Sequence, residues 1–216
     1  FNITVVVNPE PVGIDSTYSI CSNVQIDIPL NDDDISNGIT NNTFTVTVQD
    51  NPDVTGESGS NSSPATSISQ TLVNTSGQDQ DVIYTVTPES ADNCFGEPFT
   101  ITITVKPEPV IGAKITQVCS DVPVNYNLDT LQAGSGDSYT YTVSNNAQPD
   151  RTTASADSIL DIYNNTGNTN DSYQYLITPF GSNGCMGDNF TLTTIVRPEP
   201  VVGDQNVTVC SDDSLA

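Results

Sequence analysis

Three copies of one hexapeptide recur along this chain: Val7-Asn8-Pro9-Glu10-Pro11-Val12, Val105-Lys106-Pro107-Glu108-Pro109-Val110 and Val196-Arg197-Pro198-Glu199-Pro200-Val201. A cysteine follows the first proline of each copy at the same interval, at Cys21, Cys119 and Cys210. This recurrence indicates internal repeats of about ninety-five residues, and repeats have to be recognised before any fold is assigned.

The hexapeptides also predict the domain boundaries. Residues 1–11 match the last strand and linker of a repeat, residues 12–109 and 110–200 form two complete repeats, and residues 201–216 match the start of another. We therefore expect a longer array, in which neighbouring repeats of the same chain are the main partners. Proline fixes φ and keeps the preceding residue extended, which predicts a semi-rigid linker at each boundary. The linker prolines are Pro9, Pro11, Pro107, Pro109, Pro198 and Pro200.

Each repeat consists of short apolar stretches separated by turn-forming residues. Phe99, Ile101, Ile103 and Val105 alternate with threonines, and this period of two is typical of a half-buried strand. We predict strands over residues 18–20, 24–28, 43–49, 67–73, 82–87 and 99–105, and over 115–118, 124–128, 139–143, 158–163, 173–178 and 190–196. Six short strands per repeat without a helical period predict an all-β fold of tandem immunoglobulin-like β-sandwiches.

The charge balance excludes several classes of partner. The chain carries 27 acidic and 4 basic residues, no histidine, and a net charge of −23. Nucleic acid and anionic lipid both require a basic surface, so neither is an expected partner. Without histidine there is no Ser-His or Cys-His pair, and we expect no enzymatic activity. No apolar run is long enough to span a membrane, which predicts no direct membrane insertion.

The five cysteines follow the repeats. Cys21, Cys119 and Cys210 each lie at the first strand of a repeat and are followed by a serine, whereas Cys94 and Cys185 lie in the turn before the last strand. We predict disulfides Cys21–Cys94 and Cys119–Cys185, one in each repeat, and a partner for Cys210 outside the chain. Metal or nucleophile roles are poorly supported because no Cys-x-x-Cys motif or histidine accompanies the cysteines. Disulfides place the protein outside the cytosol.

Acidic turns raise the question of calcium binding. Asp32, Asp33 and Asp34 concentrate the oxygen ligands that calcium selects, and Asp121 is a candidate for an ion held between domains. The first cluster does not fit an EF-hand loop, because Asn37 stands where that loop requires glycine. A solvated turn is the simpler interpretation, and calcium is the only cofactor that the sequence suggests.

The combined motifs of the chain resemble the PKD-like repeats of giant bacterial cell-surface adhesins, of the SprB-like gliding type. These motifs are Val118-Cys119-Ser120-Asp121, Leu72-Val73-Asn74-Thr75, Tyr84-Thr85-Val86-Thr87-Pro88, Asn93-Cys94-Phe95-Gly96 and Thr100-Ile101-Thr102-Ile103-Thr104-Val105. The second repeat departs from the pattern, with Asp161-Ile162-Tyr163-Asn164-Asn165 in the place of the late Leu-Val-Asn-Thr motif.

The resemblance implies an extracellular, cell-surface filament that is exported by type IX secretion and serves adhesion or gliding motility. Its partners would be surface glycans or abiotic surfaces. The resemblance also implies O-glycosylation at the hydroxyl residue of Asp-Ser or Asp-Thr pairs. The candidate acceptors are Ser16, Thr130, Ser158 and Ser214.

A second function remains open beside the adhesin. The chain could serve as an accessory carbohydrate-binding or spacer module of a secreted polysaccharide-degrading enzyme. Exposed aromatic side chains would then contact the sugar, and the candidates are Tyr139, Tyr141, Tyr173 and Tyr175. The absence of tryptophan disfavours a flat sugar-binding platform.

Overall fold

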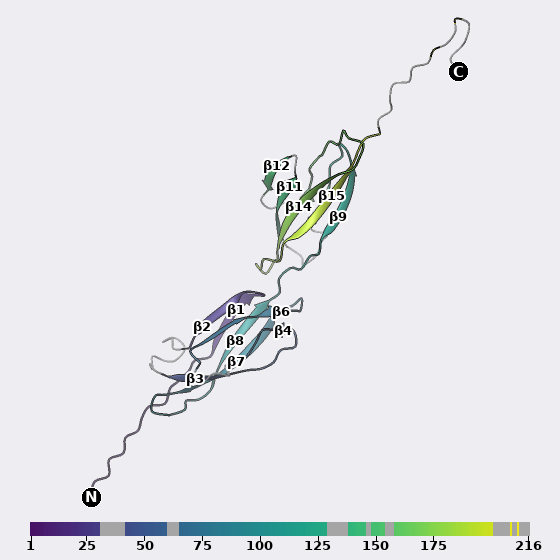
Figure 1. Cartoon of the computed structure of the whole chain (residues 1–216). Helices are drawn as coiled ribbons and strands as arrows, with labels where there is room; N and C mark the ends of the chain where they lie inside the picture. Colours follow the sequence, from purple (N-terminus) through teal and green to yellow (C-terminus); the bar gives the residue numbers. More distant parts are fainter. Residues whose placement is uncertain are drawn as a thin grey trace. The chain divides into compact units, whose positions relative to one another are not determined.

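The computed structural model describes residues 1–30, 42–59, 65–128, 138–145, 148–153 and 158–200, together with Thr208 and Ser211. Every labelled element in these ranges is a β-strand, and no α-helix occurs among them (Figure 1). None of the described segments therefore forms a helix that is long and apolar enough to cross a membrane. The all-β fold predicted from the sequence is confirmed, with two tandem β-sandwich domains.

The first repeat contains all six predicted strands and a short additional one. Their bounds are β1 Ser16–Cys21, β2 Gln25–Pro29, β3 Thr43–Val48, β4 Val54–Thr55, β5 Ser67–Thr71, β6 Val73–Asn74, β7 Gln80–Glu89 and β8 Phe99–Lys106. The predicted strand over residues 67–73 is divided into β5 and β6. Strand β4, which pairs with β6, was not predicted because two residues show no periodicity.

Two layers enclose the core of the first repeat. One layer is a four-stranded sheet in the order β1-β8-β7-β3 (Figure 1). The strand pairs β2-β5 and β4-β6 are two separate two-stranded sheets. Phe99, Ile101, Ile103 and Val105 of β8 are all buried, while the threonines between them are half-buried. They join Phe44 and other apolar side chains in one hydrophobic cluster, so the predicted alternation is confirmed.

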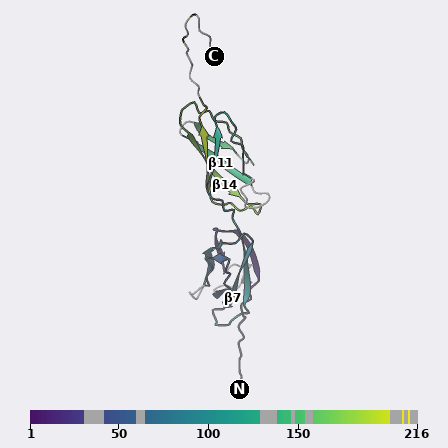
Figure 2. The same ribbon diagram turned by 90° about the vertical axis from the view of Figure 1, so that its right-hand side faces the viewer.

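The second repeat follows the same plan. Its strands are β9 Lys114–Cys119, β10 Tyr126–Asn127, β11 Ser138–Asn145, β12 Gln148–Thr153, β13 Ser158–Ile159, β14 Asp171–Phe180 and β15 Phe190–Arg197. The larger sheet has the order β12-β11-β14-β15-β9, and β10 pairs with β13. Figure 2 shows β11 beside β14 from a second direction. All six predicted strands are present, and β12 is an addition.

The opening strand of each repeat runs parallel to the closing strand. Strand β1 pairs with β8 and places Cys21 opposite Lys106, the last residue of β8. Strand β9 pairs with β15 in the same way and places Cys119 opposite Arg197. The cysteine that ends each opening strand therefore lies at the C-terminal end of the closing strand.

This parallel register makes the predicted disulfide pairing wrong. Cys94 precedes β8, so it lies beyond the opposite end of that strand from Cys21. At about 3.3 Å per residue, the eight-residue strand β8 separates its two ends by about 23 Å. A disulfide requires Cα atoms within about 7 Å of each other, so Cys21 cannot bond Cys94. The same register in the second repeat separates Cys119 from Cys185.

The chain forms two compact units, and their division does not follow the linker alone. The first unit contains Phe1–Ile111 and, from the second repeat, the segment Thr178–Asp188. The second unit contains the described residues of 112–131, 139–177 and 189–216. The segment Thr178–Asp188 comprises the end of β14 and most of the turn that leads to β15.

Candidate functional site

The most distinctive arrangement in the first compact unit surrounds the linker after β8. We call it the linker junction. Its three parts are the linker Pro107–Pro109, the turn Gly181–Gly187 and the end of β1 at Cys21–Asn23. All of these residues belong to the first compact unit.

A disulfide between Cys21 and Cys185 closes the linker junction. The Cα atoms of the two residues are 5.5 Å apart, and Cys185 is fully buried. The bond connects the opening strand of the first repeat with the late turn of the second, across a sequence separation of 164 residues. Cys94 and Cys119 carry free thiols, the former half-buried and the latter exposed. Cys210 lies outside the described residues.

A glycine allows the turn to approach the linker closely. A Cβ atom at Gly187 would stand 2.0 Å from the carbonyl oxygen of Pro109, far inside van der Waals contact. The first repeat reproduces this relationship, because a Cβ atom at Gly96 would stand 2.0 Å from the carbonyl oxygen of Pro11. Each Cys-x-Gly turn therefore packs on the second proline of the linker that precedes its own repeat.

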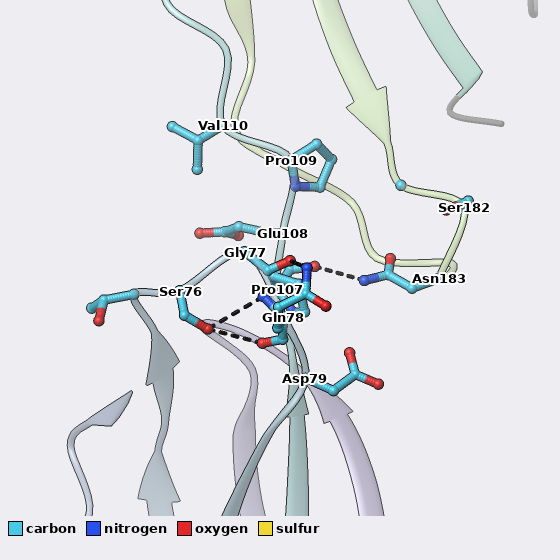
Figure 3. Close-up of a pocket in the computed structure, with 12 residues that line it drawn as sticks. Ser76, Gly77, Gln78, Asp79, Pro107, Glu108, Pro109, Val110, Ser182 and Asn183 are labelled. Carbon is cyan, nitrogen blue, oxygen red and sulfur yellow. Dashed lines mark hydrogen bonds between the residues drawn. The ribbon is translucent and has the colours of Figure 1, made fainter. Parts of the chain in front are cut away.

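Hydrogen bonds hold the turn in its bent form. The side-chain amide of Asn183 donates to the carbonyl oxygen of Pro107 at 2.8 Å, as Figure 3 shows. The side-chain oxygen of Asn183 accepts from the backbone N–H of Cys185 at 3.0 Å. Gly184 has a φ of 84°, a left-handed conformation that glycine adopts without strain. Asn183 thus links the disulfide-bonded cysteine to the linker backbone.

The glutamate of the linker has an unfavourable charge environment. The side-chain amide of Asn23 donates to Glu108 Oε1 at 3.0 Å. Burial raises the pKa of Glu108 above its ordinary value, and the nearby carboxylate of Asp188 raises the pKa further. The hydrogen bond from Asn23 opposes this shift without cancelling it. The junction therefore favours the protonated form of Glu108.

A buried asparagine supports the strand end beside the disulfide. Asn74 donates from its side-chain amide to the carbonyl oxygens of Gln78 and Val105, both at 2.7 Å. Its backbone N–H donates to Ser22 Oγ at 3.1 Å, which accounts for the serine after Cys21. These contacts tie the late loop of the repeat to the ends of both β1 and β8.

The second repeat contains an equivalent network. Asn165 donates to the carbonyl oxygens of Thr169 and Val196, at 2.8 and 2.9 Å, and its backbone N–H donates to Ser120 Oγ at 2.9 Å. Asn165 is therefore the structural counterpart of Asn74. The second repeat's departure from the late motif thus does not extend to the asparagine that makes these contacts.

Sequence reasoning assigned no role to the asparagines of these networks or to the two close-packed glycines. The available signals were an Asn-Thr pair late in each repeat, at Asn74-Thr75 and Asn165-Thr166, and a Cys-x-Gly turn in each repeat. Both features recur in the sequence, but a recurrence does not reveal which contacts it preserves.

An open cleft of about 770 Å³ adjoins the linker junction. Residues from the loop Thr75–Asp79, the linker Pro107–Val110 and the turn Gly181–Asn183 line it (Figure 3). A cleft of about 510 Å³ lies at the preceding linker, between Glu10–Asp15 and Glu97–Phe99. The linker Pro107–Pro109 thus lines the first cleft, and Glu10 and Pro11 of the preceding linker line the second.

Of the four calcium candidates, only Asp121 lies in the described part of the chain. Asp32, Asp33 and Asp34 lie outside the described residues. Asp121 has a φ of 60°, and its carboxylate oxygens accept from the side-chain amide of Asn164 at 3.0 and 3.1 Å. The described ranges contain no group of three or more His, Cys, Asp or Glu side chains that could hold a metal. The structure thus places Asp121 in a left-handed turn stabilised by Asn164.

The candidate glycosylation acceptors divide in the same way. Ser16 begins β1 and its hydroxyl donates to the carbonyl oxygen of Ile14 at 3.3 Å. Ser158 begins β13 and is half-buried. Thr130 and Ser214 lie outside the described residues. Glycosylation of these residues stays a prediction.

Two of the four candidate sugar-binding tyrosines are buried, which overturns their predicted exposure. Tyr175 is fully buried, and its hydroxyl group lies 2.6 Å from that of Tyr163 and donates to Asp161 Oδ2 at 3.0 Å. Tyr173 stacks on Tyr163 with ring centroids 3.8 Å apart. Both therefore belong to the core of the second repeat. Tyr139 lies in β11, as does Tyr141, but the description does not extend to their side chains.

The linker prolines differ in burial according to what covers them. Pro11 and Pro109 are buried under their glycine turns, and Pro107 is half-buried. Pro9 and Pro200 are exposed, and Pro198 is half-buried. Pro11 and Pro109 thus each contact the repeat that follows, which restrains these two linkers more than their φ angles alone would.

The fold and the linker junction define a class of protein, that of tandem β-sandwich repeats whose linkers are packed into the following repeat. A family model described as the PKD-like domain matches residues 18–109 and 116–200. The chain therefore belongs to the PKD-like domain family, with two domains in tandem.

Several solved structures resemble the chain at low sequence identity. Drosophila N-cadherin EC1-4 has a TM-score of 0.37 at 15% identity, covering 89% of this chain and 50% of its own. Human protocadherin-24 EC1-2 has a TM-score of 0.34 at 11% identity, covering 90% of this chain and 100% of its own. An endo-fucoidan hydrolase from glycoside hydrolase family 107 has a TM-score of 0.32 at 13% identity, covering 91% of this chain and 30% of its own.

The chain spans half the length of the N-cadherin fragment and less than a third of the fucoidan hydrolase. No significant match was found among curated proteins. PKD-like domains and a disulfide bond together indicate an extracellular or secreted protein.

Proposed function

We propose that this chain is a structural repeat segment of an extended cell-surface adhesin. Its PKD-like domains act as spacers that carry an adhesive region away from the cell. Adhesion to surface glycans or abiotic surfaces resides in variable loops or at a distant tip. A role in gliding motility, with export by type IX secretion, is the more specific form of this proposal.

The observation that carries the proposal is the Cys21–Cys185 bond. A single soluble domain is usually stabilised by a disulfide within that domain, whereas this bond connects two successive repeats. Such a connection resists unfolding when the ends of the chain are pulled, because the residues between the two cysteines cannot be extended. Resistance to pulling is a requirement of a load-bearing stalk and not of a freely diffusing enzyme.

The charge supports the same proposal. A net charge of −23 makes repeats repel each other and disfavours lateral association. Neither the linker junction nor the buried asparagine networks contain a nucleophile paired with a base, and we propose no catalytic role. The accessory-module alternative loses two of its four sugar-contacting candidates, because Tyr173 and Tyr175 are buried.

An experiment on intact cells tests the proposal. Antibodies raised against the chain should label the surface of the source cells, with gold particles at a distance from the envelope in electron micrographs. In affinity electrophoresis, the chain should migrate unchanged in gels that contain polysaccharides. Recovery of the protein only from the culture medium, with retardation by a polysaccharide, would instead establish the accessory module.

A further inference from the structure

Two cysteines in the described chain have no disulfide partner, yet each has a bonded counterpart. Cys94 occupies in the first repeat the turn position that Cys185 occupies in the second. Cys119 ends the opening strand of the second repeat, as Cys21 ends that of the first. The one disulfide therefore joins one cysteine of each kind, from two successive repeats.

The turn of Cys94 has the same local geometry as the turn of Cys185. The N–H of Gly96 donates to the carbonyl oxygen of Pro88 at 2.9 Å, and that of Gly187 donates to Pro179 at 2.9 Å. An isolated β-bridge closes each turn, between Glu89 at the end of β7 and Phe95, and between Phe180 at the end of β14 and Met186. Both turns pack their glycine on the preceding linker, as described above. Cys94 is therefore held at the linker Pro9–Pro11 as Cys185 is held at Pro107–Pro109.

The strand ends that carry Cys21 and Cys119 also match. The N–H of Ser22 donates to the carbonyl oxygen of Lys106 at 2.8 Å, and that of Ser120 donates to Arg197 at 2.9 Å. In both cases the cysteine carbonyl oxygen accepts from the residue three positions later, Val24 or Val122. Cys119 is therefore placed at the start of the linker Pro198–Pro200 as Cys21 is placed at Pro107–Pro109.

We propose that disulfides in this protein form a ladder in which every repeat is bonded to the next one. Cys119 bonds the turn cysteine of a following PKD-like repeat, and Cys94 bonds the opening-strand cysteine of a preceding one. The partner is a repeat with a Cys-Ser strand end or a Cys-x-Gly turn beside a Pro-Glu-Pro linker. The inference deepens the proposed function and rests on it in one respect, that further repeats flank this chain.

Each disulfide between two successive repeats is one rung of this ladder. A rung is made by thiol–disulfide exchange with an oxidant of the disulfide class, such as a dithiol oxidoreductase in its oxidised form. One cysteine thiolate attacks the oxidant disulfide and forms a mixed disulfide, releasing one oxidant thiol. The thiolate of the second cysteine then attacks the cysteine sulfur of the mixed disulfide and releases the other oxidant thiol. Two protein thiols are oxidised, one oxidant disulfide is reduced to two thiols, and the protons are conserved.

The ladder determines which segments carry a pulling force. A force that crosses one rung arrives at a turn cysteine and continues along the backbone to the next strand-end cysteine. From Cys94 to Cys119 this path consists of a turn, β8, the linker and β9, and the interval from Cys185 to Cys210 is the same in the sequence. Strands rise about 3.3 Å per residue, close to the limit of an extended chain, so these segments cannot lengthen much.

The first test uses the chain as it is. Peptide mapping by mass spectrometry under non-reducing conditions should recover Cys21 linked to Cys185. Cys94 and Cys119 should react with a maleimide in the folded protein. A Cys21–Cys94 or Cys119–Cys185 linkage would overturn the ladder, because it would place the bonds within single repeats.

The second test supplies the missing neighbours. The chain through Pro200 is continued by a second copy that begins at Val12, which preserves the spacing of the Pro-Glu-Pro linker. Peptide mapping after oxidation should show a new linkage between Cys119 of the first copy and Cys94 of the second. Both Cys21–Cys185 linkages should persist. A free Cys119 in the first copy of a folded four-repeat chain would overturn the proposal.

A matched variant guards against misfolding as an explanation. Cys119→Ser in the first copy should add one newly reactive thiol, that of Cys94 in the second copy, and leave every other linkage unchanged. Loss of either Cys21–Cys185 linkage in this variant would contradict the expectation that each rung forms independently of the others. These tests do not depend on where the protein is located. If the disulfides between repeats form but the cell surface is not labelled, only the adhesin proposal is refuted. If the surface is labelled but these disulfides do not form, only the ladder is refuted.

Discussion

Thr194 occupies in β15 the buried position that Ile103 occupies in β8. Both are the fifth residue of an eight-residue strand, and both side chains are fully buried. Ile103 contributes only apolar atoms to its core, whereas Thr194 Oγ1 has no hydrogen-bond partner among the residues that the structure describes. The second repeat therefore carries the cost of desolvating a hydroxyl group at a site where the first repeat has none.

Replacing Thr194 by valine should stabilise the second repeat. The substitution keeps the shape of the side chain and removes the unpaired hydroxyl, so we expect a gain of about 1 kcal/mol in the free energy of unfolding. Urea denaturation followed by tyrosine fluorescence measures it. Thr193→Val, at the half-buried neighbouring position, is the control and should change stability by less than about 0.5 kcal/mol. A loss of stability in Thr194→Val would show that the hydroxyl is hydrogen-bonded.

Replacing Gly187 by alanine should loosen the linker junction. The new methyl group would meet the carbonyl oxygen of Pro109, a backbone atom that cannot turn away, so the turn has to shift. We expect a loss of about 1–3 kcal/mol, the usual range for overpacking. Gly112→Ala is the control, because no atom lies within 4 Å of a Cβ atom there. Equal thermal stability of the two variants would contradict the close packing of turn and linker.

Replacing Asn165 by alanine should destabilise the second repeat strongly. The change removes two donated hydrogen bonds, leaves the carbonyl oxygens of Thr169 and Val196 without their side-chain donor, and removes the acceptor for the N–H of Gly167. At about 1 kcal/mol per bond, we expect a loss of about 3 kcal/mol in urea denaturation. Exposed Asn168→Ala serves as the control. A similar loss should follow Asn74→Ala in the first repeat, and unequal losses would show that the two networks are not equivalent.

The charge of Glu108 should make the linker junction less stable as the pH rises. The pKa of this carboxyl is higher in the folded protein than in the unfolded chain, so the folded state binds more protons. Stability is therefore highest below the unfolded pKa and falls as the pH rises through the folded pKa. Glu108→Gln should raise the melting temperature at pH 7 and have no effect at pH 3. Because the carboxyl is partly solvated, the gain should stay below about 1 kcal/mol.

Pulling the chain from its two ends should reveal the effect of the disulfide directly. In the oxidised protein the segment between Cys21 and Cys185 cannot be stretched, whereas reduction releases it. With a sequence separation of 164 residues, reduction should add about 570 Å of contour length in single-molecule force spectroscopy. Cys185→Ser should behave like the reduced protein, and Cys94→Ser like the oxidised one. Equal contour lengths for the Cys185→Ser and Cys94→Ser variants would contradict this prediction.

Local patterns in the sequence were sufficient to predict most of the fold. The alternation of Phe99, Ile101, Ile103 and Val105 with threonines identified β8 and its buried face, since a strand repeats every two residues. The three Pro-Glu-Pro motifs marked two repeats of the same plan. Strands β4 and β6 were missed or merged with a neighbour, because pairs of two residues depend on contacts and have no period of their own.

The candidate site could be predicted only in part. Cysteines, linker prolines and the Cys-Ser and Cys-x-Gly motifs are all visible in the sequence, and they do form the linker junction. The roles of Asn74 and Asn165 were not predictable, because a buried asparagine and an exposed one look the same in a sequence rich in asparagine. The burial of Tyr173 and Tyr175 also depends on their partners, among them Tyr163 and Asp161.

The sequence by itself determined the repeats, the strands and the presence of cysteines at corresponding positions. The tertiary structure decided which cysteines bond. The parallel pairing of β1 with β8 brings Cys21 to the end of β8 where the linker begins, and Gly187 lets the turn of Cys185 pack on that same linker. Strand register and close packing are contacts between residues far apart in the chain, so no spacing of residues along the sequence encodes them.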